Sequence, residues 1–255
     1  MPEGDTIWRT AAALRARLAG RTVVRVAPAA LERVTGLRVD AVEAEGKHLL
    51  VRFSRGEGRV PLVLHSHMRM TGSWHLYAPS ERWRRPPHRA RAVLEVEDAV
   101  AVCFDAPVVE LRADDGAATR HLGPDILAAE LDLDGVLVRV RAGGDRPLGE
   151  LLLDQRVCAG IGNIWRCESL WRLRLDPWSG SAALDDEALR GLYTTARELM
   201  LASRDRRGPD PFHRPQVHGR TRRPCPRCAA PIRVRPQGEQ RRLTYHCPSC
   251  QRVTA

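Results

Sequence analysis

The chain has 255 residues, of which 43% are hydrophobic, and a formal net charge of +10 at pH 7. This length suits two domains, and the hydrophobic content is enough for a buried core, which excludes an intrinsically disordered protein. No apolar run approaches the length of a membrane span, and residues 1–5 lack the basic and apolar regions of a secretory signal, so we expect a cytoplasmic protein with reduced cysteines.

The N-terminal half begins with a predicted helix, followed by strands. The helix is capped by Asp5 or Thr6 and ends at Gly20, and its apolar residues recur at helical spacing: Ile7, Ala11, Leu14 and Leu18. The β-rich runs that follow are separated by turn residues: 23–26, 37–42, 49–53, 60–64, 93–96, 100–104 and 136–140. Because no long helices alternate with them, the pattern favours an antiparallel β-sandwich.

The spacing of apolar residues becomes helical near Pro147. We predict helices over residues 148–155, 164–173 and 185–201, with a glycine-rich interruption at 160–162. Asn163 stands at the N-cap position of the second helix. A tight glycine turn there would present backbone N–H groups at a helix N-terminus, which suits phosphate binding; the alternative is a helical hairpin that serves packing.

The excess positive charge is concentrated in the C-terminal fifth of the chain. Residues 200–255 contain 13 arginines and 3 acidic residues, which accounts for the net charge of +10, while residues 1–199 are neutral overall. A basic segment attached to a neutral body indicates a surface that binds a polyanion, with nucleic acid as the leading candidate. The alternative is a solvated basic tail.

Two C-x2-C pairs in the basic segment argue against a tail. Cys225 and Cys228 are separated by 18 residues from Cys247 and Cys250, a spacing typical of a four-thiolate zinc site. Residues 232–235 and 242–246 between them read as two short strands of a hairpin. Because four cysteines fill the coordination sphere, we expect one structural Zn²⁺ that folds this segment. The remaining cysteines are expected to be core thiols: Cys103, Cys158 and Cys167.

Lys47 is the only lysine among 41 basic residues. A lysine amine can be tuned to transfer protons or to form a Schiff base, whereas arginine stays protonated. Lys47 is therefore a candidate catalytic group, and the alternative is one exposed lysine retained by chance.

Several motifs together resemble the formamidopyrimidine-DNA glycosylase and endonuclease VIII family of base-excision repair enzymes. They extend over essentially the whole chain: Pro2-Glu3-Gly4, Glu45-Gly46-Lys47, Ser66-His67 to Gly72-Ser73, His121-Leu122-Gly123-Pro124-Asp125, Leu153-Asp154-Gln155 to Gly162-Asn163, and the cysteine hairpin. The resemblance implies an α+β protein with a β-sandwich domain at 1–123, a helix-two-turns-helix domain at 124–214 and a zinc finger at 215–255. It also implies a monomer, associated with the bacterial nucleoid, that binds damaged double-stranded DNA in the cleft between its lobes; single-stranded or bubble DNA remains an alternative.

The resemblance also implies the chemistry. After removal of Met1, the secondary amine of Pro2 attacks the sugar C1′ of the damaged nucleotide and forms an iminium, which permits β- and then δ-elimination. An α-amino group has a pKa of about 8, below the value of about 10.4 for lysine, so more of it is neutral at physiological pH. Glu3 matches the proton donor to the sugar ring oxygen, and Lys47 matches a lysine that contacts phosphate and assists β-elimination. Arg242 matches an arginine that grips phosphate and is assigned to δ-elimination.

The remaining matches concern DNA contact and lesion choice. Asn163, Arg69 and His121 match positions that contact DNA, and Met70 matches a residue that fills the gap left by a flipped base. The purine-specific branch of the family carries an Arg and a Phe in a loop that here reads Asp105-Ala106-Pro107-Val108-Val109-Glu110. The chain between residue 201 and the zinc hairpin is also shorter than in that branch, which leaves out its lesion-capping loop. These departures favour the endonuclease VIII branch and oxidised pyrimidines.

Three alternatives remain open at this point. The first is an 8-oxoguanine or formamidopyrimidine enzyme of the same family. The second is a non-catalytic zinc-ribbon DNA-binding protein, which gives no reason for Pro2 and Glu3 at the start of the chain. The third is a lyase whose nucleophile is Lys47 in place of Pro2.

Overall fold

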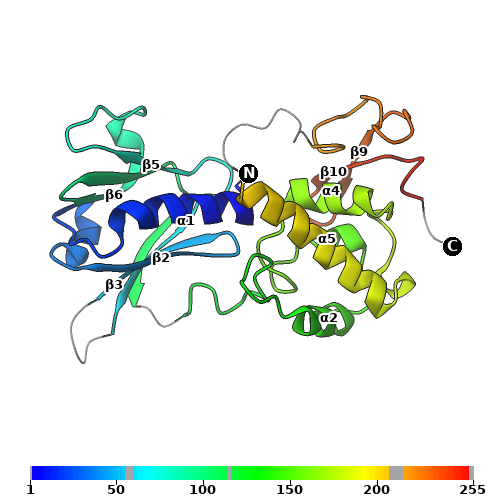
Figure 1. Cartoon of the computed structure of the whole chain (residues 1–255), viewed down its shortest axis with the longest axis horizontal. Coiled ribbons are helices and arrows are strands. Elements are labelled where there is room, and N and C mark those ends of the chain that lie inside the picture. Colours follow the sequence, from blue (N-terminus) through cyan, green and yellow to red (C-terminus); the bar gives the residue numbers. More distant parts are fainter. Residues whose placement is uncertain (1, 55–59, 114–115, 207–214, 253–255) are drawn as a thin grey trace. The chain divides into compact units, whose positions relative to one another are not determined.

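The structure is a computed structural model that describes residues 2–54, 60–113, 116–206 and 215–252. The chain forms two compact units, Met1–His121 and Leu122–Ala255 (Figure 1). Among the described residues, no helix combines the length and the apolar character that crossing a bilayer requires.

The first unit is a β-sandwich with one long helix, α1 (Gly4–Leu18). Two four-stranded antiparallel sheets have the strand orders β1-β6-β7-β5 and β2-β3-β4-β8. The strands are β1 Arg25–Ala27, β2 Val39–Glu45, β3 His48–Phe53, β4 Leu62–His67, β5 Ser73–Tyr77, β6 Ala90–Val96, β7 Ala99–Phe104 and β8 Val108–Ala113. The antiparallel sandwich predicted from the alternating strands is thus confirmed. Strands β5 and β8 had no counterpart in the runs identified from the sequence.

Helix α1 buries one face against β2, β3 and β7. The apolar residues at helical spacing are at most 1% exposed: Ile7, Ala11, Leu14 and Leu18. The expected cap is wrong, because the N-cap residue is Glu3. The carbonyl oxygen of Glu3 accepts hydrogen bonds from the backbone N–H groups of Thr6 and Ile7, so the first turn begins before Asp5.

The strand expected at 136–140 is also wrong, because these residues lie in helix α2 (Leu133–Ala142). The Asp132 carboxylate accepts a hydrogen bond from the backbone N–H of Gly135 at 2.8 Å and caps the helix. Val136 and Val140 are buried four residues apart, whereas Val138 between them is 67% exposed. The run of valines therefore has a helical period, which its β-branched composition concealed.

The second unit combines helices with a hairpin. It contains α3 (Leu148–Leu151), α4 (Asn163–Arg172) and α5 (Asp186–Arg204), followed by the antiparallel pair β9 (Arg233–Gln237) and β10 (Arg242–His246). Helix α3 ends earlier than predicted because the next residues form a turn. There the Gln155 amide donates to the carbonyl oxygens of Leu153 and Ile161 and accepts from the N–H of Gly160.

Candidate functional site

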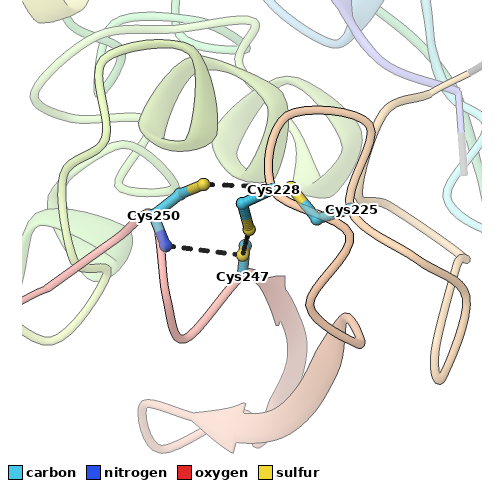
Figure 2. A group of neighbouring side chains, drawn as sticks. All are labelled: Cys225, Cys228, Cys247 and Cys250. Atoms are coloured by element: carbon cyan, nitrogen blue, oxygen red, sulfur yellow. Dashed lines mark hydrogen bonds between the residues drawn. The ribbon is translucent and has the colours of Figure 1, made fainter.

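The four cysteines of the two C-x2-C pairs converge at one end of the β9–β10 hairpin (Figure 2). Their Sγ atoms lie within 4.8 Å of one another, and the distances are 3.9 Å for Cys225–Cys250 and 3.4 Å for Cys228–Cys247. Tetrahedral zinc with bonds of about 2.3 Å requires sulfur atoms roughly 3.8 Å apart. Among the described residues, this is the group of cysteine, histidine and acidic side chains placed closely enough to hold a metal ion.

The pKa values of the cysteine thiols differ between members of the cluster. Burial opposes ionisation of Cys225, but N–H groups of Arg227 and Trp171 donate to its Sγ, and its pKa falls to about 6. Burial and the neighbouring thiols raise the pKa of Cys250 to about 12. A bound divalent cation would allow all four sulfur atoms to be thiolates, and a set of four thiolates favours zinc.

The cysteine cluster packs against the C-terminal half of α4. Cys225 and Cys247 share a small core with Trp171 and Cys167 of that helix. The Arg227 guanidinium stacks 4.3 Å above the Trp171 ring and donates to the Trp171 carbonyl oxygen. The hairpin is thereby held by α4 through a compact apolar contact in addition to any metal.

Asn163 connects the N-terminal end of α4 to the hairpin. The N-cap residue of α4 is Gly162, so the expected capping role of Asn163 is wrong. Its Nδ2 donates instead to the carbonyl oxygen of Leu243 at 2.9 Å, and its Oδ1 accepts from Arg166 at 2.5 Å. Asn163 is half-buried, and one N–H of its amide is not required by these two bonds.

Arg166 is fully buried beneath Asn163. Its guanidinium also reaches the carbonyl oxygens of Leu243 and Gly149 and the Gln237 side chain, at 3.3–3.4 Å. A buried guanidinium is tolerated only when it is extensively hydrogen-bonded. Arg166 therefore ties α3, α4 and the hairpin into one arrangement around Asn163.

A cavity of about 580 Å³ lies between the turn that follows α3 and the β9–β10 hairpin. Its lining includes Arg242, Arg146 and Arg156. Hydrogen bonds from Arg156 and Arg146 lower the pKa of Asp154 to about 2, so this carboxylate stays ionised and occupies both guanidinium groups. Arg242 is half-buried, and its Nε donates to the side chain of Gln240. The second unit thus presents Arg242 and Asn163 from the same hairpin–helix junction.

In the first unit, Pro2 and Glu3 directly precede α1. Pro2 is half-buried, and Glu3 is only 2% exposed. A buried carboxyl group at this position is not the solvated N-terminal acid that a glutamate usually is. The structure places it next to the residue that would become the N-terminus after removal of Met1.

Lys47 lies in the two-residue turn between β2 and β3, next to Gly46. Gly46 adopts a φ of 58°, a left-handed conformation that tight hairpins require. Lys47 is 7% exposed, so the only lysine is not the exposed residue that a chance survival would suggest.

Arg69 and Met70 occupy the connection between β4 and β5. This turn is tight: a side chain at Gly72 would meet the backbone of Met68 at 2.8 Å, and Arg69 has a φ of 44°. Met68 is buried and anchors the turn, whereas Met70 is 65% exposed. The turn therefore presents Met70 and Arg69 outward from a rigid base.

Comparison with known proteins relates this arrangement to one family. A model of the formamidopyrimidine-DNA glycosylase N-terminal domain matches residues 1–107, and a model of the H2TH domain of the same enzyme matches residues 122–208. The "Probable endonuclease 8 2" of Streptomyces coelicolor is 41% identical over 268 residues, which cover 98% of this chain and 94% of that protein. The chain belongs to the formamidopyrimidine-DNA glycosylase and endonuclease VIII family.

Two further relatives cover both branches of this glycosylase and endonuclease VIII family. The "DNA-(apurinic or apyrimidinic site) lyase Nei2" of Mycolicibacterium smegmatis is 37% identical and covers 98% of this chain and 99% of its own length. The crystal structure of MutM (Fpg) from Thermus thermophilus superposes with a TM-score of 0.80 at 31% identity, covering all of both chains. As a member of the family, the chain is a DNA glycosylase and AP lyase, and the fold expected from its motifs is confirmed.

Sequence reasoning missed residues that support those it named. It did not single out Arg166, which holds Asn163, or Gln251, whose amide accepts from Cys247 and donates to the carbonyl oxygen of Leu175. Nor did the sequence show that His65 hydrogen-bonds to His48. Arg166 could have been identified from its position, because it is a charged residue in an apolar stretch of α4, three residues after Asn163.

Proposed function

We propose that this chain removes oxidised pyrimidines from DNA and then cleaves the strand at the resulting abasic site. The observation that carries the proposal is the start of the chain, where buried Glu3 adjoins Pro2 in a family member with full-length endonuclease 8 relatives. Pro2 is the proposed nucleophile. Its nitrogen bonds to C1′ of the damaged nucleotide as the bond from C1′ to the base breaks.

Glu3 is the proposed general acid. It gives a proton to the sugar ring oxygen as the C1′–oxygen bond breaks, which leaves an iminium between C1′ and Pro2. The iminium withdraws electrons, so a proton can leave C2′ and the 3′ phosphate can depart, followed by the 5′ phosphate. Glu3 is only 2% exposed, so its carboxyl group is shielded from bulk solvent.

Lys47, Asn163 and Arg242 are proposed to act on the phosphates. Lys47 contacts phosphate and assists β-elimination. Asn163 donates its remaining amide N–H to a phosphate of the DNA backbone. Arg242 clamps phosphate during δ-elimination; its guanidinium is a poor proton donor, so we assign it a charge-pairing role. His121 and Arg69 are proposed as further DNA contacts, and both are exposed.

The choice of pyrimidines rests on two turns of the first unit. The connection of β7 to β8 contains Asp105-Ala106-Pro107, and Ala106 is 1% exposed. This turn therefore offers no long side chain to insert beside a purine lesion. Exposed Met70 in the β4–β5 connection is left as the proposed gap-filling residue.

The cysteine cluster is proposed to hold one structural Zn²⁺. Cys225, Cys228, Cys247 and Cys250 fill all four tetrahedral positions, so the metal has no open site for catalysis. Its proposed role is to fix the hairpin that carries Arg242.

Borohydride trapping tests the nucleophile. We expect the wild-type chain to form a covalent complex with abasic-site DNA after reduction. Lys47→Ala should retain this complex, whereas a chain extended by residues before Pro2, which converts the amine to an amide, should lose it. A wild-type chain without any adduct would overturn the enzymatic proposal, and an adduct with the extended chain would move the nucleophile away from Pro2.

A lesion panel tests the substrate. Duplexes carrying 5-hydroxyuracil should be cleaved faster than duplexes carrying 8-oxoguanine under single-turnover conditions. The reverse order would assign the chain to the purine-specific activity instead.

A further inference from the structure

Three histidines gather around a fourth, His48, in the first unit. The His48 ring lies 5.0 Å from that of His65, 4.9 Å from that of His67 and 5.8 Å from that of His121, measured between centroids. The Nδ1 atom of His48 and the Nε2 atom of His65 are 2.8 Å apart, a hydrogen bond between two side chains. The proposed mechanism assigns no role to His48 or His65.

Strand alternation explains how the cluster forms. Along β4, Leu62 and Leu64 face the sandwich core, so His65 and His67 share the opposite face. The neighbouring strand β3 pairs Leu50 with His65, which places His48, two residues earlier, on that same face. The cluster therefore results from the registers of β3 and β4 and does not depend on a flexible loop.

The His48–His65 pair has one favoured arrangement of protons. Among the described residues, the Nδ1 atom of His65 is buried without a hydrogen-bond partner, and the nearest carboxylate oxygen, from Glu110, is 4.0 Å away. An unpaired buried acceptor costs less than an unpaired buried N–H. Placing the shared proton on Nε2 of His65, as donor to Nδ1 of His48, leaves the buried Nδ1 of His65 as an acceptor instead of an unpaired N–H.

The cluster connects two turns that carry proposed functional residues. Lys47 lies in the β2–β3 turn, and His48 is the next residue and the first of β3. The rings of His48 and His67 pack edge to face. The Nδ1 atom of His67 in turn accepts from the backbone N–H of Arg69 at 3.2 Å, at the base of the Met70 turn. A displacement of His48 would therefore move Lys47 relative to the Arg69–Met70 turn.

His48 and His67 are neutral near pH 7. Burial, followed by the positive charge of its neighbours, lowers the pKa of His48 to about 3 and that of His67 to about 4. The charged groups that face the cluster are Lys47 and Arg69 from the turns, Glu45 from β2, and Glu110 and Arg112 from β8. A neutral pair keeps one proton between the two rings, as the hydrogen bond requires.

We propose that His48 and His65 are positioning residues of the lyase step, whose hydrogen bond fixes the Lys47 turn against the Arg69–Met70 turn. The inference rests on the proposed function, because it assumes that Lys47 assists elimination. It adds two residues that act through Lys47 without touching DNA themselves.

Two substitutions at His65 separate hydrogen bonding from packing. The amide of His65→Gln can donate from the position of the imidazole Nε2, whereas His65→Leu keeps comparable bulk and cannot donate. We expect His65→Leu to slow elimination at a preformed abasic site about tenfold in single turnover, and His65→Gln to restore it to within about threefold of wild type. Borohydride trapping, which depends on Pro2, should be unchanged in both variants.

A matched control is His75→Leu, which removes a half-buried histidine that hydrogen-bonds to Ser73 in the other sheet. This variant should eliminate at the wild-type rate. Should His65→Leu fail to fold, His48→Ala and His48→Asn provide the same comparison, because the Asn amide can take the place of the imidazole Nδ1.

The outcomes separate this inference from the proposed function. Elimination at the wild-type rate in His65→Leu, or equal slowing in His65→Leu and His65→Gln, would overturn the positioning role. A parallel loss of trapping and elimination would likewise overturn it, since a general structural defect would then explain both. A wild-type chain that traps no DNA would instead overturn the proposed function itself.

Discussion

The Asn163 side chain and the Leu243 carbonyl oxygen, 80 residues apart in the sequence, are joined by a hydrogen bond of 2.9 Å. This bond fastens the first turn of α4 to β10, next to Arg242. The buried Arg166 strengthens this contact, because its guanidinium donates to both the Asn163 Oδ1 and the Leu243 carbonyl oxygen. The position of the proposed phosphate clamp therefore depends on a helix and a hairpin that are distant in sequence.

Replacing Asn163 tests this junction. Asn163→Leu keeps the size of the side chain but removes the shortest of the hydrogen bonds that Arg166 donates, and leaving a buried donor unsatisfied costs about 1–3 kcal/mol. We expect a lower urea midpoint and at least tenfold weaker binding to a non-cleavable abasic-site duplex. An Asn163→Leu chain with wild-type stability and affinity would show that the junction is dispensable.

Removing the metal should unfold the hairpin and spare the first unit. We expect one zinc ion per chain, and loss of DNA binding after chelation, because so small an apolar core cannot fold alone. Cys228→Ala should lose the ion. Cys167→Ala is the matched control, since Cys167 is a buried thiol in the same core and lies outside the quartet. Retained zinc in Cys228→Ala would contradict the four-thiolate site.

Lys47→Arg tests why this chain has a single lysine. The substitution keeps the positive charge but replaces a tunable amine with a guanidinium that stays protonated. We expect slower β-elimination, measured as strand cleavage at an abasic site, with unchanged Schiff-base trapping. Base release and strand cleavage at wild-type rates would make the lysine an accident of composition.

Met70→Ala should affect duplex substrates selectively. Because Met70 is 65% exposed at the tip of a rigid turn, we expect it to fill the gap behind a flipped base. The variant should excise 5-hydroxyuracil several-fold more slowly from duplex DNA, while excision from single-stranded DNA, which has no gap to fill, stays close to wild type. Equal slowing on both substrates would argue for a structural effect.

The histidine cluster predicts acid-sensitive stability. The pKa of His48 is about 3 in the folded chain and 6.5 as its reference value, so the unfolded chain takes up the proton first as the pH falls. The contribution of His48 to stability is complete above pH 6.5 and is lost progressively toward pH 3. Urea unfolding at pH 7.5, 6.0 and 4.5 should show a smaller loss in His48→Asn than in wild type. Identical pH dependence in the two chains would contradict the lowered pKa.

Local patterns determined much of this protein from the sequence alone. The cysteine spacing predicted the cluster because two C-x2-C knuckles bring their own ligands together wherever the chain forms a hairpin. Alternation predicted the sandwich, and the apolar spacing of α1 identified its buried face, since both signals depend only on near neighbours. The run 136–140 was misread for the same reason: its β-branched residues carry a strand propensity, which the cap at Asp132 and burial of one helical face override.

Only the tertiary structure decided which side chains meet. The sequence placed Asn163 at a helix start but could not show that its amide binds Leu243 rather than capping α4. The sequence could not pair His48 with His65 either, because their hydrogen bond follows from the register between β3 and β4. Hydrogen bonds between residues far apart in sequence depend on packing of whole elements, and no local spacing encodes that packing. The chemistry-bearing residues could be named from the chain, whereas the contacts that hold them in place could not.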